Sequence, residues 1–462
     1  MAKPSFFLKP SLPGTIALLV SIAVAYASFP SKVISSEMAS AAAIPVGIGY
    51  LISILFDIRD GGLRNLFRTD LLCLVGIYAL TLAEFLFPQE IFNTMVDTFE
   101  TSLALQMTLP GIAALAIGRH FVPAKEMKSK FLTLNDLSDD SLFKIVAVCT
   151  FMGFLYMLIA VNFKLFGDKS LIYHLMGARF SQPWSRGRLG GFGTLLNEFG
   201  LLLYAVPPLA GVIINRWKSF PKLQFILALL MFFLTMFQGI SGGTRNVFIS
   251  YMATFVMGYF LTVKKNTIIN TIFPLILSVW FIGFASYHML EFRTMGLRKY
   301  LENRVYATGS TRETLAVDYN LASMGKIASN VPSVYAFAGP EIITWSIVKP
   351  IPRAFWPSKP EGLSISLEEM AGAGGWTIAI TFIGEAYVTA GLPGVLLISL
   401  GFGALAAWWN RMAIASQTDY GLVVYALGFF AAGLTMRSML WLTTAALPVI
   451  ALVLFRKYGP FK

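Results

Sequence analysis

The chain has 462 residues, of which 56% are hydrophobic and 13% charged, and its formal net charge is +12. A soluble domain holds about 25% charged residues, so this composition excludes an ordinary soluble enzyme. Apolar runs of about 17 to 25 residues recur along the chain, and each can cross a bilayer as a helix, whereas a membrane barrel would have short alternating strands. The sequence therefore predicts an all-α integral membrane protein, whose basic residues anchor loops to the membrane rather than bind nucleic acid.

Apolar run length predicts about twelve transmembrane helices. The first is expected to be retained rather than cleaved as a signal peptide, because it lacks a convincing small-residue cleavage site and a second apolar run follows. The predicted limits, in chain order, are about 12–29, 39–56, 70–87, 102–118, 143–165, 192–214, 223–240, 246–263, 267–288, 392–409, 420–436 and 438–455.

The charges of the loops predict the orientation of these helices. Every loop or tail that would lie on the same side as the N-terminus carries Lys or Arg, and short cytoplasmic loops attract these residues. Both termini are thus predicted to be cytoplasmic. The chain then divides into nine helices within 1–290, with a periplasmic loop at about 167–191, a large periplasmic loop at 291–391, and three helices within 392–462.

The predicted periplasmic loops are unusual because they carry many arginines, which exported loops generally lack. Guanidinium groups bind phosphate oxygens through parallel hydrogen bonds, so this surface predicts an anionic ligand, most simply a phosphate. There is no P-loop, HExxH motif or His/Cys cluster, so neither a metal nor a cofactor is predicted. The arginines are Arg179, Arg186, Arg188, Arg293, Arg298, Arg304, Arg312 and Arg353.

Three arginines lie in settings that could fix a guanidinium in place. Arg353 lies with Lys359 in PIPRAFWPSKPEG, where prolines restrict the backbone. Arg245 follows SGGT and Arg437 lies in TMRSM, each in a very short connection between predicted helices. Charges near a span are costly and are often functional. The alternative is a solvated Arg353 and two arginines that extend to the membrane interface.

Two residues are candidates for accepting a proton. Glu385 lies in the apolar segment TFIGEAYVTAGLPG, where a carboxylate could act as a general base or orient an arginine. His288 lies in SYHMLEF at the outer end of a predicted helix, and histidine transfers protons near neutral pH. A purely structural role is the alternative for both.

Four segments together, SGGTRN, PIPRAFWPSKPEG, TFIGEAYVTAGLPG and TMRSM, resemble the Wzy-type O-antigen polymerases of bacterial surface polysaccharide synthesis. They occur in the order found in that family, and the hydropathy profile is similar over nearly the whole chain. Ser438 is a departure, because the resemblance predicts glycine after Arg437.

The resemblance implies a bundle like that of the C-type glycosyltransferases, in the bacterial inner membrane with its active site on the periplasmic face. It implies transfer of a growing glycan from undecaprenyl diphosphate to the next lipid-linked repeat unit, with inversion at the anomeric carbon. A polysaccharide chain-length regulator is an implied partner. In this interpretation the diphosphate binds Arg245, Arg353 and Arg437, with Lys359 and Arg179 as secondary candidates, and Glu385 or His288 accepts the proton.

Two other functions stay open at this point. An O-antigen ligase would use the same donor with a different acceptor, so the arginines cannot separate it from a polymerase. A polytopic transporter or flippase would also have about twelve helices with both ends inside. Against a transporter, the longest loop is not central and cytoplasmic, and no two-fold repeat is evident.

Overall fold

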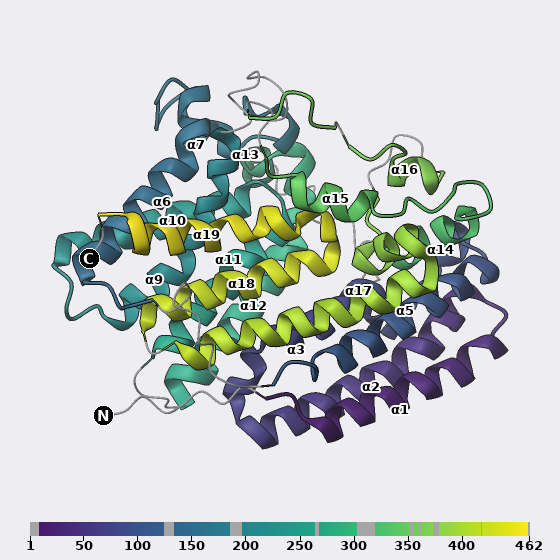
Figure 1. Ribbon diagram of the computed structural model, residues 1–462. Helices are drawn as coiled ribbons and strands as arrows, with labels where there is room; N and C mark the ends of the chain where they lie inside the picture. The colour runs from purple at the N-terminus through teal and green to yellow at the C-terminus, as the bar shows by residue number, and fades with distance from the viewer. Residues whose placement is uncertain are drawn as a thin grey trace.

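The computed structural model describes residues 9–123, 134–184, 196–263, 268–302, 319–351, 355–360, 362–372, 378–416 and 418–460. In these ranges the chain forms helices and no β-strand, as predicted. Long helices lie side by side, and α1 begins on the same side of the molecule as α19 ends (Figure 1). We call this side the basal end, and the opposite side, where α18 ends and α19 begins, the apical end.

The N-terminal helices and α17 enclose one hydrophobic core, to which α14 contributes its buried face. α1 packs along α2, and α5 packs between α14 and α17. The elements of this group are α1 (Leu12–Ser28), η1 (Phe29–Ser31), α2 (Ser35–Gly61), η2 (Leu63–Phe67), α3 (Thr69–Thr81), η3 (Ala83–Leu86), α4 (Phe92–Met95), α5 (Thr98–Gly118), α14 (Asn320–Asn330) and α17 (Thr381–Ala415).

The central helices form a second core with the last two helices of the chain. α11 packs on α9, and α18 lies between α11 and α17 and so joins the two cores. The elements of this group are α6 (Asp139–Ala160), η5 (Phe199–Ala205), α9 (Val206–Asn215), α10 (Lys222–Ser241), α11 (Arg245–Thr262), α12 (Ile268–Met295), α18 (Asp419–Arg437), η7 (Met439–Trp441) and α19 (Leu442–Tyr458).

Short helices follow the apical ends of the long ones. α15 packs against η7 and the beginning of α19, and α16 contacts α14. These elements are α7 (Leu171–Leu175), η4 (Arg179–Ser181), α13 (Leu297–Glu302), α15 (Glu341–Val348) and α16 (Leu367–Met370).

α5 and α17 approach closely because each has a glycine at their crossing. A methyl group on Gly118 would collide with the carbonyl oxygen of Leu400, and one on Gly403 would collide with that of Leu115. Small residues at helix crossings let backbones pack tightly without bulky side chains between them, as in many membrane proteins. The contact fixes α17 against the first core.

α17 consists of two helical parts joined by a kink. Gly391 has φ +67°, a left-handed backbone that glycine adopts at little cost, and Ala390 before it also leaves the helical region. Pro393 follows in the first turn of the second part, where proline fits a helix start. The kink separates the short apical part, which includes Glu385, from the long part that continues to the basal end.

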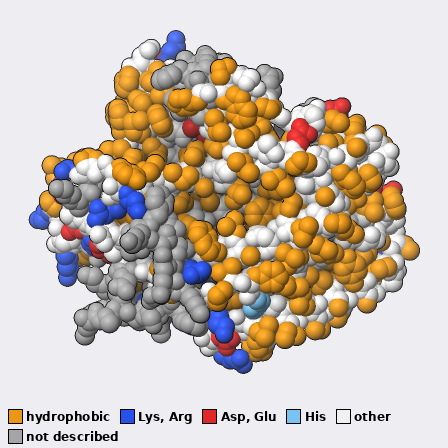
Figure 2. Space-filling view, viewed as in Figure 1, with side chains coloured by type: hydrophobic (Ala, Val, Ile, Leu, Met, Phe, Trp, Pro, Cys, Tyr) orange, Lys and Arg blue, Asp and Glu red, His pale blue; other side chains and the backbone are white. Residues whose placement is uncertain are grey.

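Nine helices in the described ranges are long and apolar enough to cross a membrane. Each of the twelve predicted segments overlaps a helix, but α3, α11 and α12 are not among the nine. α3 has only 13 residues, and in α12 the described stretch Pro274–Ala285 is apolar. A membrane-type helical bundle is therefore confirmed, whereas the number twelve and the periplasmic loop remain predictions. Figure 2 shows hydrophobic side chains over much of the face formed by α17, α18 and α19.

Candidate functional site

The apical ends of α17 and α18 meet at Glu385, whose side chain is only 2% exposed. Its carboxylate accepts a hydrogen bond from the Ser438 hydroxyl at Oε1 and one from the Met439 backbone N–H at Oε2, the latter at 2.6 Å. Both oxygens thus hold the turn that directly follows Arg437. Glu385 and Arg437, which were predicted to share one site, are brought together at the level of the backbone.

Ser438 explains how this turn is formed. The residue has an extended backbone, with φ −164° and ψ 127°, and so ends α18 at Arg437. Its hydroxyl accepts a hydrogen bond from the Leu440 N–H at 3.3 Å while it donates to Glu385, which starts η7 in a new direction. The glycine that was expected at this position would supply no such hydroxyl.

Two lysines lie next to this turn. Lys349, at the C-terminus of α15, places Nζ 3.8 Å from the ring centroid of Trp441. Burial lowers the pKa of Lys349, and the charges of Glu385 and Glu198 partly oppose this effect. Lys359 donates from Nζ to the carbonyl oxygens of Lys349, at 2.6 Å, and Ile351, at 2.9 Å. The hydrogen bonds of Lys359 thus hold residue 359 next to residues 349 and 351, the start of the same stretch of chain.

An apolar groove of about 210 Å³ begins directly below this turn. α18 forms part of its lining together with α3, α17 and α19, and the side chains are mainly apolar. Its apical end is marked by Met436 and Leu442, and it extends along α18 to Gly428. At 1.5 Å per residue, the stretch from Gly428 to Met436 is about 12 Å long. The groove therefore runs along the helix axis, with its apical end one residue from Arg437.

Arg245 lies at the same end of the bundle as Arg437. The ring of Tyr204 stacks on Phe430 of α18 at 4.3 Å between centroids and meets Tyr251 of α11 edge-on at 4.9 Å. From these rings, Arg245 is about 9 Å along α11 and Arg437 about 10 Å along α18, both toward the apical end. The prediction that they share one face of the molecule is consistent with this arrangement.

The other predicted residues lie elsewhere or outside the described ranges. His288 on α12 contacts the Tyr300 hydroxyl through Nδ1 at 2.6 Å and packs against Phe284. Arg179 lies in η4, with its guanidinium 5.7 Å from the Phe180 ring centroid. The described contacts of both residues join them to their own neighbourhoods rather than to Glu385. Arg353 is not among the described residues.

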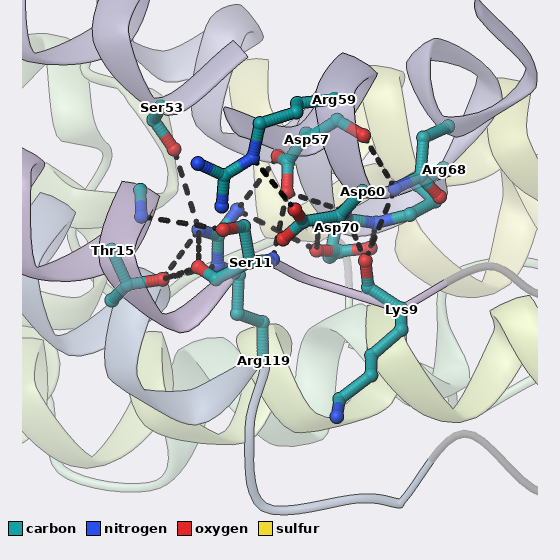
Figure 3. Close-up of polar contacts among 12 residues, drawn as sticks. Lys9, Ser11, Thr15, Ser53, Asp57, Arg59, Asp60, Arg68, Asp70 and Arg119 are labelled. Atoms are coloured by element: carbon teal, nitrogen blue, oxygen red, sulfur yellow. Dashed lines mark hydrogen bonds and ion pairs between the residues drawn. The ribbon is translucent and has the colours of Figure 1, made fainter. Parts of the chain in front are cut away.

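A second charged cluster lies at the basal end and was not predicted. Arg68 and Arg119 point toward Asp57 and Asp70, and all four side chains are almost completely buried (Figure 3). Arg68 donates to Asp57 Oδ1 at 2.8 Å and through two nitrogens to both oxygens of Asp70. Arg119 lies 3.6 Å from Asp57 and 3.8 Å from Asp70. Two cations and two carboxylates thus balance inside the protein.

Uncharged groups complete the basal cluster and connect it to other helices. Thr15 of α1 accepts from Arg119 Nε at 3.1 Å and also contacts His120 Nε2 at 2.7 Å. Asn410 of α17 donates to Asp70 and accepts from the Tyr425 hydroxyl of α18 at 2.9 Å. The cluster therefore links α1, α2, α3 and α5 to α17 and α18. The available sequence signal was Asp57, an acidic residue near the end of a long apolar run.

The fold and these two clusters define an all-helical protein of membrane type, with charged groups concentrated at both ends of the bundle. Comparison of the chain with protein-family models, curated proteins and solved structures finds no match. The features that bear on function are therefore the residues themselves and the resemblance of the four segments.

Proposed function

We propose that this protein is a bacterial polymerase of lipid-linked oligosaccharide repeat units, a glycosyltransferase of the O-antigen polymerase type in the inner membrane. The observation that carries the proposal is the position of the apolar groove, whose apical end lies beside Arg437, Lys349 and the turn that Glu385 holds. An apolar groove that ends at cations is suited to bind an amphiphile with a long apolar tail and an anionic headgroup. A polyprenyl diphosphate has this form.

In the proposed reaction, a hydroxyl oxygen of the lipid-linked acceptor unit attacks the anomeric carbon of the growing glycan. The bond between that carbon and the undecaprenyl diphosphate oxygen breaks, with inversion, and the acceptor hydroxyl loses its proton. Negative charge develops on the diphosphate, and fixed cations stabilise such charge best. We assign this role to Arg245, Arg353 and Arg437, with Lys359 and Arg179 as secondary candidates.

Lys349 is an addition to these residues. Its ammonium group is close to the turn after Arg437, and its strongest electrostatic partners include the Glu385 carboxylate. A partly buried lysine on an aromatic ring is poorly solvated, so it gains more than a solvated lysine from an anionic ligand. Lys349 is therefore expected to contribute to binding of the diphosphate.

Glu385 is better suited to positioning than to proton transfer. Both of its oxygens already accept hydrogen bonds from the turn after Arg437, which orients the carboxylate toward that turn. We propose that Glu385 orients Arg437 through Ser438 and Met439. His288 stays the alternative proton acceptor, although a diphosphate is a good leaving group and needs little help from a base.

The test is deletion of the gene in its host, followed by gel analysis of the surface polysaccharide. Wild-type protein should restore a ladder of chain lengths, and Arg353→Ala should leave a single repeat unit while protein abundance is unchanged. Wild-type-length polymer from Arg353→Ala would refute the assignment of that arginine. Lys457→Ala, at the basal end of α19, serves as the matched control and should restore the ladder.

The same experiment separates the two other functions. Complete loss of attached polysaccharide, with long glycan retained on the lipid carrier, would identify a ligase. An unchanged ladder in the deletion strain would exclude both enzymes and favour a transporter or flippase.

A further inference from the structure

α15 has an exposed apolar face. Ile343, Ile347 and Ile351 recur every four residues and are 40%, 58% and 38% exposed. Ile343 and Ile347, four residues apart, share one side of α15, which ends at Val348, and Ile351 follows shortly after the helix. The opposite side of α15 is packed, because Ile342 and Ser346 are buried. The exposed residues of α15 are thus Ile343, Thr344 and Ile347, and the two isoleucines form an apolar stripe with Ile351 just beyond the helix.

The packed side fixes α15 against the helices of membrane type. The Thr443 hydroxyl of α19 donates to the Ser346 carbonyl oxygen, and Lys349 lies over Trp441 of η7. The stripe consequently has a defined position at the apical boundary of α19.

The isoleucine stripe belongs to a wider apolar surface. Trp441 on η7 is exposed, as are Leu392 and Leu396 near the apical end of the long part of α17, and α15 contacts both elements. Phe355 and Trp356, shortly after the stripe, are exposed as well. Because the surface continues onto helices that can span a membrane, lipid is the occupant that fits.

We propose that α15 is an interfacial helix that lies in the bilayer at the apical end of the protein. The stripe would insert among the acyl chains, and Lys349 and Lys359 would lie at the level of the lipid phosphates. Amphipathic helices bind membranes in this way, with an apolar face toward the chains and basic residues toward the headgroups. The aromatic side chains of Trp356 and Trp441 suit the same interfacial depth.

This placement has a consequence that rests on the proposed function. If α15 marks the headgroup level, the apical end of the groove opens at the depth of the lipid phosphates. A diphosphate-linked lipid would then reach Arg437 and Lys349 by lateral diffusion, with its tail still in the bilayer.

The test is a measurement of depth, which does not require activity. Single cysteines would replace Ile343 and Ile347 in the full-length protein and carry a nitroxide, with the protein in nanodiscs of phosphatidylcholine and phosphatidylglycerol. Glu369, an exposed residue on α16, is the water-facing control, and Ile342 is the buried control. Power saturation would compare collisions with oxygen, which enters the bilayer, and with a water-soluble nickel chelate.

We expect oxygen to relax the labels at 343 and 347 several times more strongly than the nickel chelate does, with the order reversed at 369. Equal access of the chelate at 347 and 369 would overturn the proposal, because the stripe would face water. Low access of both reagents at 347, as at 342, would also overturn it, because protein rather than lipid would cover the face.

Background labelling is expected to be small, because both native cysteines, Cys73 and Cys149, are free and buried. Ile347→Ser would separate effects on membrane placement from effects on folding, because the site is exposed and the substitution removes no core contact. Neither result depends on glycan synthesis. A failed depth test with a normal polysaccharide ladder would reject the interfacial helix and leave the polymerase proposal intact.

Discussion

The two charged regions of the molecule differ in how their charges are satisfied. At the basal end, Arg68 and Arg119 face Asp57 and Asp70, and Arg216 pairs with Asp136 and Asp419 at the same end. At the apical end, the buried Glu385 carboxylate is held by a hydroxyl and a peptide N–H, and the nearby Lys349 rests on a tryptophan ring.

This difference indicates two separate roles. Cations and carboxylates that neutralise each other inside the protein hold helices in register and need no ligand. Breaking such a pair is costly, because the remaining charge stays buried without a partner. Lys349 instead lies over a tryptophan ring, beside a turn that a single buried carboxylate holds. The basal cluster therefore serves the fold, whereas the apical residues are those to which we assign the proposed substrate site.

The largest expected effect is loss of stability when the basal cluster is broken. Arg68→Ala leaves two buried carboxylates with one cation and should reduce the free energy of unfolding by about 3–5 kcal/mol. Thermal unfolding of the detergent-solubilised protein, followed by size-exclusion chromatography, measures the effect. Arg59→Ala is the control, because the pair of Arg59 with Asp60 is exposed and solvent-screened and should contribute little to stability. Equal melting temperatures for the two variants would show that the basal cluster does not stabilise the fold.

The next effect is loss of function without loss of fold. Arg437→Ala should lower the rate of chain extension by about 10²–10³-fold, the magnitude typical for one group that stabilises developing charge. Its melting temperature should change less than that of Arg68→Ala. Extension measured with purified protein and lipid-linked repeat units provides the rate. If Arg437→Ala extends chains at the normal rate but has a lower melting temperature, Arg437 has a structural role like that of Arg68.

A smaller effect tests the coupling of Glu385 to Ser438. Glu385→Gln retains one acceptor oxygen, and Ser438→Ala removes the donor, so each should weaken binding of a polyprenyl diphosphate. If Glu385 acts through the turn, the double variant should be less impaired than the sum of the single effects, with a coupling of about 0.5–3 kcal/mol. A measurable rate of chain extension in Glu385→Gln would also support a positioning role, because a glutamine side chain cannot accept the proton. Strict additivity would indicate that the two side chains act independently.

The smallest expected effect is on the pH dependence of stability, through His120 at the basal end. Burial, with the nearby Arg119, lowers the pKa of His120 to about 4. The folded protein therefore binds fewer protons than the unfolded chain between pH 6.5 and 4, so stability should fall as pH is lowered through this window. His120→Asn should flatten this dependence by less than about 1.4 kcal/mol per pH unit, since the ring is partly exposed. Melting curves between pH 7.5 and 4.5 would test it, and an identical slope in the variant would contradict it.

Hydropathy predicted the helices well, because each of the twelve apolar ranges overlaps a helix in the structure. It placed the start of α17 near 392, whereas the helical segment begins at Thr381. The reason is local: Gly391 breaks the helix, and the polar Glu385 interrupts the apolar run before it. Run length and hydropathy cannot predict a kink within a helix. They also cannot predict a buried carboxylate whose hydrogen-bond partners are distant in sequence.

The candidate sites were predicted less completely. Glu385 and Arg437 were identified because each interrupts an apolar segment. Lys349 was missed because its neighbours Glu385 and Trp441 are distant in sequence. Arg68 and Arg119 were interpreted as membrane anchors, because a basic residue at a helix end has the same sequence pattern whether it faces water or a buried aspartate.

The hydrogen bonds of Lys359 have a thermodynamic consequence. Because Nζ binds carbonyl oxygens of Lys349 and Ile351, the ends of a ten-residue segment are joined before any ligand arrives. Closing an open segment of that length costs roughly 2 kcal/mol of chain entropy. In this segment the cost is met during folding, so an anion that binds there would not have to offset it, and the affinity for a given set of contacts would be correspondingly higher.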